Sequence, residues 1–111
     1  MDFQSRQENN VTVVTVSGRM DALTAPVFQD RMSGLIAVGD TVLVVDLALL
    51  EYISSAGLRS ILTIAKALKS KGGQLIFVNV TGTVRDVFDM SGFGTIFPMH
   101  GSLADALGVL G

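Results

Sequence analysis

Two adjacent serines, Ser54 and Ser55, are the residues of this sequence best placed to do chemistry. They stand between an apolar run over residues 42–47 and an amphipathic stretch that begins at about residue 55. A serine before a helix commonly accepts a hydrogen bond from a free N–H group of the first turn. One hydroxyl suffices for that, so the second is free to meet a partner or to carry a phosphate. Such a phosphate, with a charge of about −1.5 to −2, would face the positive end of the helix dipole. The plainer alternative is that both serines serve only the helix start.

A serine hydrolase is the enzymatic alternative for the same pair. It would need His100, the single histidine of the chain, beside Ser54 or Ser55, and the sequence does not place it there. The serines also lack the glycine two positions earlier that a nucleophile elbow uses. We therefore expect no enzyme and no catalytic residue, with His100 an ordinary loop residue.

No other pattern predicts a cofactor or a metal site. The chain has no cysteine, and no pair of carboxylates has the spacing of metal ligands. The string Gly92-Phe93-Gly94 follows a predicted helix rather than a strand and lacks the lysine of a nucleotide-binding loop, so we expect a turn there. For Asp21 and Asp46, a structural role in capping or loop hydrogen bonds is an alternative at least as strong as a functional role.

Length and composition set the class of protein. The chain has 111 residues, 49% hydrophobic and 16% charged, which suits one globular domain over residues 1–111. Its eight basic residues are scattered and give no dense basic face for nucleic acid. No apolar run approaches the ~20 residues that span a bilayer, and the first residues do not form a signal peptide. We expect a cytoplasmic protein that neither binds nucleic acid nor inserts into a membrane.

The serines must be positioned by the elements around them, which the hydrophobic pattern predicts in the order β-β-α-β-α-β-α-β-α. Strands are predicted over residues 3–7, 11–16, 41–47, 74–80 and 94–99, and helices over 23–38, 55–70, 83–90 and from about 103. The continuous Val and Leu run over 41–47 indicates a central strand covered on both faces. The fold class is therefore α/β, a mixed sheet of four or five strands covered by about four helices.

Each long helix has a predicted buried stripe. In the first it comprises Leu23, Val27, Phe28, Met32, Leu35 and Ile36, and in the second Leu58, Ile61, Leu62, Ala65 and Leu68. Opposite the second stripe, an outer face is predicted from Arg59, Ser60, Thr63, Lys66 and Lys69. The lysines are expected to be solvated.

Three segments of the chain resemble those of the STAS family, named for sulfate transporters and anti-sigma factor antagonists. Gly18-Arg19-Met20-Asp21 resembles the Gly-x-Leu-Asp that precedes the first helix of that family. Tyr52-Ile53-Ser54-Ser55-Ala56-Gly57-Leu58 resembles its signature loop, and residues 84–93 resemble its later helix and turn. The resemblance covers essentially the whole chain and is strongest to the single-domain bacterial anti-sigma factor antagonists.

The resemblance implies a partner-switching mechanism. In that mechanism the unphosphorylated antagonist binds an anti-sigma factor with serine kinase activity, and so frees the sigma factor. The kinase then phosphorylates a serine of the signature loop, the pair separates, and a serine phosphatase resets the cycle. By the family pattern the acceptor is Ser55. The alternative is Ser54, which stands where many members have Asp.

The predicted partner-binding surface surrounds that serine. It combines the loop with the outer face of the following helix, and it comprises Asp21, Ser54, Ala56, Gly57, Arg59, Ser60 and Thr63. Asp21 is included because it matches a family acid near the acceptor. The alternative function within the family is a STAS adaptor, or an accessory subunit of a membrane transporter, that does not switch by phosphate.

Overall fold

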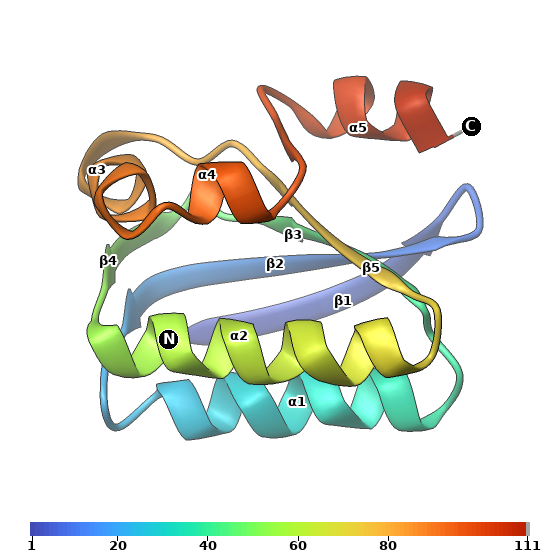
Figure 1. Cartoon of the computed structure of the whole chain (residues 1–111), viewed down its shortest axis with the longest axis horizontal. Helices are drawn as coiled ribbons and strands as arrows, with labels where there is room; N and C mark the ends of the chain where they lie inside the picture. The colour runs from blue at the N-terminus through green and yellow to red at the C-terminus, as the bar shows by residue number, and fades with distance from the viewer. Residues whose placement is uncertain (111) are drawn as a thin grey trace.

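A mixed sheet forms the centre of the computed structural model, which describes residues 1–110 (Figure 1). The elements in chain order are β1 (Asp2–Glu8), β2 (Val11–Met20), α1 (Ala25–Ala37), β3 (Val42–Asp46), β4 (Leu50–Ile53), α2 (Ser55–Ser70), β5 (Gln74–Val78), α3 (Gly82–Ser91), α4 (Phe93–Ile96), β6 (Met99–His100) and α5 (Leu103–Leu110). The sheet order is β1-β2-β3-β5-β6, and β4 pairs with β2 outside this path. Only the β1–β2 pair is antiparallel among these strands. The predicted mixed α/β fold is confirmed, with β4 and α4 as additional elements.

Side chains of the central strands alternate between two cores. In β3, Leu43 and Val45 enter the main core together with α1 and α2, whereas Val44 enters a smaller core beneath α5. Figure 1 shows α1 and α2 side by side along one side of the sheet and α5 on the other. Since both faces of β3 are covered, the continuous apolar run needs no polar alternation.

The second strand is longer than predicted. It was expected to end near Gly18, but it continues to Met20 and pairs there with the unpredicted strand β4. Gly18 has a φ of +85°, and the register shifts between it and Arg19. Glycine tolerates this backbone conformation, so a bulge bends the strand instead of ending it.

The predicted strand over residues 94–99 is wrong. The chain forms the short helix α4 and then the two-residue strand β6, which lies at the sheet edge as Pro98 indicated. Phe93 and Phe97 are one helical turn apart, and the N–H of Phe97 donates to the Phe93 carbonyl at 3.0 Å. Their rings meet edge to face with centroids 5.4 Å apart, so aromatic packing selects the helical turn.

The buried stripe of α1 also differs from the prediction. Leu23 precedes the helix and is 86% exposed, and Val27 is exposed as well. The residues actually buried are Ala25, Phe28, Met32 and Ile36, which keep helical spacing. The turn before α1 delays the helix start to Ala25, and this start shifts Leu23 out of the core.

The bounds of two other helices agree well with those predicted from the sequence. Helix α2 spans Ser55–Ser70 as predicted, and α5 begins after Ser102, whose hydroxyl accepts a hydrogen bond from the Asp105 N–H at 3.1 Å. Across residues 1–110, none of the helices has the length and apolar character needed to cross a bilayer.

Candidate functional site

The serine pair lies at the start of α2, and its two members differ in role. Ser54 is the N-cap with extended backbone, and its hydroxyl accepts a hydrogen bond from the Gly57 N–H at 3.4 Å. Ser55 is the first helical residue, and its side chain is exposed. The Ser54 hydroxyl is therefore engaged by the helix, whereas the Ser55 hydroxyl faces solvent at the positive end of the helix dipole.

A backbone hydrogen bond brings the Asp21 loop to the serines. The N–H of Ser54 donates to the carbonyl oxygen of Met20 at 2.9 Å, where β4 and β2 end side by side. Asp21 follows Met20 directly, so residues far apart in sequence share one end of the sheet. Ligands and partners of open α/β sheets bind at such carboxyl ends of strands.

The Asp21 carboxylate shapes the turn before α1. It accepts hydrogen bonds from the N–H groups of Leu23 at 3.0 Å and Thr24 at 3.1 Å. These bonds, first that of Thr24 and then that of Leu23, hold the pKa of Asp21 below its ordinary value because they favour the charged form. Asp21 thus places a negative charge beside the serine loop. These are the loop hydrogen bonds that the structural alternative for Asp21 predicted, and its part in partner binding stays a prediction.

Two of the predicted surface residues lie exposed along α2. Arg59 and Thr63 follow Ser55 at intervals of four residues, and all three side chains are exposed. Residues four apart lie on one helix face. The Thr63 hydroxyl donates to the Arg59 carbonyl at 3.1 Å, a hydrogen bond within α2. Ala56, beside them, is half-buried.

The outward placement predicted for Ser60 is wrong. Ser60 is only 5% exposed, and its hydroxyl donates to the Ala25 carbonyl of α1 at 3.3 Å. Gly57 is also buried, against Ile53 and Met20. Ser60 thus faces α1, whereas the predicted core residue Leu62 is exposed. Ser60 and Gly57 therefore belong to the buried face of α2, beneath the exposed site.

Sequence reasoning missed Arg19 and Tyr52, which lie beside the loop. They are register partners on β2 and β4, and the Arg19 guanidinium stands 4.2 Å from the centre of the Tyr52 ring. The missed strand explains the omission. Its signal is the pair of apolar residues Leu50 and Ile53, both buried, around the exposed Glu51 and Tyr52.

Asp46 and His100, the remaining candidates, lie away from the serine pair in structural roles. Asp46 accepts hydrogen bonds from the Ala48 N–H at 3.0 Å and the Asn79 amide at 3.1 Å, as its loop-bonding alternative predicted. His100 lies in β6 rather than a loop, and β3 and β5 separate that strand from β2. The part of the chain that the structure describes holds no cluster of three or more acidic or histidine side chains suited to a metal.

Comparisons with known proteins agree with this arrangement. The STAS domain family model matches residues 2–106. The chain is 34% identical to BtrV of Bordetella bronchiseptica over 94 residues, covering 85% of this chain and 81% of that protein. It is 33% identical to the anti-sigma-F factor antagonist RsfB of Mycobacterium tuberculosis over 102 residues, covering 89% of this chain and 80% of that protein. A crystal structure of an anti-sigma factor antagonist from Mycobacterium paratuberculosis superposes with a TM-score of 0.88 at 28% identity, covering 97% of this chain and 92% of that one. With its fold, its serine loop and these relatives in agreement, the chain belongs to the STAS domain family.

Proposed function

We propose that this protein is a cytoplasmic, non-catalytic anti-sigma factor antagonist that is switched by phosphorylation of Ser55. Its unphosphorylated form binds an anti-sigma factor with serine kinase activity. Phosphorylation by that kinase releases it, and a serine phosphatase restores the binding form. Support for the class comes from the names of its relatives, among them RsfB.

The choice of Ser55 as the acceptor is carried by one observation, that only Ser54 of the pair caps the helix. Ser54 is engaged as the helix cap, which holds its side-chain oxygen against the Gly57 N–H. Ser55 is exposed in the first turn. A phosphate on Ser55 would lie near the helix N-terminus, where negative charge is stabilised by roughly 0.3–1 kcal/mol at an exposed site. The helix therefore tolerates the modification.

The same phosphate would oppose partner binding. Arg59 lies one turn after Ser55 on the same exposed face, within reach of a charge-assisted pair with a phosphoserine. Such a pair would withdraw Arg59 from a partner, and the phosphate would add a charge of about −1.5 to −2 to the interface. A loss of about 4 kcal/mol weakens binding roughly a thousandfold, which suffices for a switch.

The test combines site mapping with binding measurements on the purified protein and its anti-sigma factor. Incubation with ATP and that factor should add one phosphoryl group, mapped to Ser55 by mass spectrometry. Ser55→Ala should keep affinity and block phosphorylation, and Ser55→Asp should bind at least tenfold more weakly. Equal affinities of wild type and Ser55→Asp would contradict the switch, and mapping to Ser54 would move the acceptor.

A further inference from the structure

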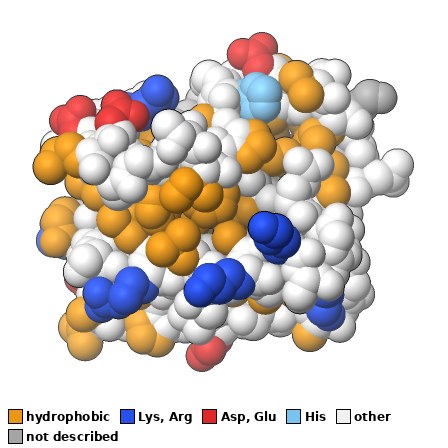
Figure 2. All heavy atoms as spheres, in the orientation of Figure 1, with side chains coloured by type: hydrophobic (Ala, Val, Ile, Leu, Met, Phe, Trp, Pro, Cys, Tyr) orange, Lys and Arg blue, Asp and Glu red, His pale blue; other side chains and the backbone are white. Residues whose placement is uncertain are grey.

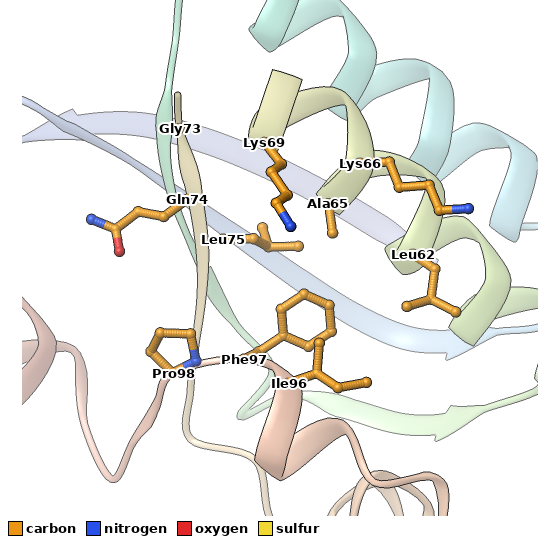
Figure 3. Close-up of a pocket in the computed structure, with 10 residues that line it drawn as sticks. All are labelled: Leu62, Ala65, Lys66, Lys69, Gly73, Gln74, Leu75, Ile96, Phe97 and Pro98. Carbon is orange, nitrogen blue, oxygen red and sulfur yellow. The ribbon is translucent and has the colours of Figure 1, made fainter. Parts of the chain in front are cut away.

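A hollow of about 340 Å³ opens between the C-terminal half of α2, the start of β5 and the end of α4. Figure 3 shows Lys69 of α2, Leu75 of β5 and Phe97 at the end of α4 pointing toward one another across it, whereas the Gln74 side chain points away. Leu75 and Phe97 form a buried floor. The volume falls in the lower part of the range of small-molecule sites, which are concave and mostly apolar.

The mouth of the hollow is apolar as well. Leu62 on α2 and Ile96 on α4 line it and are 37% and 56% exposed. Figure 2 shows hydrophobic side chains gathered in the middle of this face. Binding of a ligand that removes exposed apolar side chains from water is favourable. The shape and lining therefore favour an apolar ligand body.

Positive charge borders the same hollow. Lys66 and Lys69 line it, and no acidic residue does. Figure 3 shows the Lys69 side chain reaching over the floor, whereas that of Lys66 extends away from it. Neither lysine belongs to an ion pair found within residues 1–110. An anionic head group would complement Lys69 without displacing a partner.

We propose that this hollow binds a small free carboxylic acid with an aliphatic chain or a ring. The apolar part would lie between Leu62 and Ile96 on the floor of Leu75 and Phe97, and the carboxylate would pair with Lys69. The site lies in the half of α2 remote from Ser55, so the inference does not depend on the phosphorylation switch.

The probe is octanoate, titrated into the full-length protein and followed by amide chemical shifts in ¹H–¹⁵N NMR spectra. We expect saturable shifts at residues lining the hollow, Leu75 and Phe97 among them. Lys69→Gln should weaken binding by a factor of about 1.4 to 5, since an exposed ion pair contributes about 0.2–1 kcal/mol. Lys71→Gln removes the same charge at the C-cap of α2, outside the hollow, and should bind like wild type.

Two further variants separate the hollow from the rest of the surface. Ala65→Phe fills the space and should abolish binding, and Leu62→Ser alters an exposed wall residue and should weaken it several-fold while the fold is retained. Absence of saturable binding, or affinity unchanged in a folded Leu62→Ser variant, would overturn the proposal. Loss of anti-sigma factor binding in Leu62→Ser without octanoate binding by wild type would assign the hollow to a protein partner instead.

Discussion

Gly57 lies so close to Ile53 that a Cβ atom at position 57 would stand 2.7 Å from Cγ1 of Ile53. The same Cβ atom would stand 3.1 Å from the Met20 side chain. Because Gly57 has no side chain, α2 can begin directly on the ends of β2 and β4. That close approach is what allows the Ser54 N–H to reach the Met20 carbonyl and joins the serine loop to the Asp21 loop.

Gly57→Ala should therefore destabilise the protein despite the higher helix propensity of alanine. Overpacking of a filled core costs about 1–3 kcal/mol, and the propensity gain of ~1 kcal/mol offsets only part of it. Gly34→Ala in α1 is the matched control, because a Cβ atom there meets nothing within 4 Å. Urea denaturation should show lower stability for Gly57→Ala and slightly higher stability for Gly34→Ala. Equal stabilisation by Gly57→Ala and Gly34→Ala would show that the core around Gly57 accommodates a methyl group without strain.

The two serines should differ in their effect on stability. Ser54→Ala removes the cap of α2 and should lower the free energy of unfolding by about 0.5–2 kcal/mol, near the lower end because the hydrogen bond to Gly57 is long at 3.4 Å. Ser55→Ala removes an exposed hydroxyl and should change stability very little. Thermal or urea unfolding of the two variants beside wild type measures the difference, and the reverse order would contradict the assignment of Ser54 as the cap.

Asp21 should make stability depend on pH in the acidic range. Hydrogen bonds from Thr24 and Leu23 lower its pKa in the folded state, so the unfolded state binds more protons near the ordinary pKa of about 3.9. The stabilisation is present above that pH and is lost as the pH falls through the lower folded-state pKa. Wild type should thus exceed Asp21→Asn in stability at neutral pH, and the gap should narrow in acid.

Unfolding measured from about pH 7 to about pH 3 provides the test. Asp86→Asn, which removes a carboxylate from the exposed surface of α3, serves as the control for the change in net charge. A gap between wild type and Asp21→Asn that stays constant with pH would show that the carboxylate charge contributes nothing to folding.

The sequence was most informative where a local pattern and a cap agree. The bounds of α2 follow from an amphipathic stripe that begins after serine and ends before Gly72 and Gly73, and the structure has them unchanged. The prediction of β3 as a doubly covered strand holds for the same reason, since an uninterrupted Val and Leu run has one physical explanation.

Elements determined by distant contacts were not predictable in this way. Strand β4 has four residues and depends on pairing with β2 beyond the Gly18 bulge. The turn of α4 depends on packing of Phe93 against Phe88 and Phe97. Helical periodicity also could not fix which face of α2 meets α1, because that depends on tertiary contacts such as the hydrogen bond from Ser60 to the Ala25 carbonyl. Ser60 was assigned to the wrong face for this reason.

Ser60 and Thr63 therefore provide the sharpest separation of scaffold from binding surface. Ser60→Ala removes a buried hydrogen bond to the Ala25 carbonyl and should cost about 0.5–1.5 kcal/mol of stability. It should leave the affinity for the anti-sigma factor unchanged, because its side chain does not reach the surface. The measurement pairs urea unfolding with calorimetric titration of the partner.

Thr63→Ala should show the opposite behaviour. Its exposed hydroxyl bonds only to the Arg59 carbonyl of the same helix, and alanine is the better helix former, so stability should be unchanged or slightly higher. If the face formed by Ser55, Arg59 and Thr63 is the docking surface, affinity should fall in Thr63→Ala, and Arg59→Ala should fall further because it also removes a charge. A folded Ser60→Ala variant that binds weakly beside a Thr63→Ala variant that binds normally would place the partner on the other side of α2, against α1.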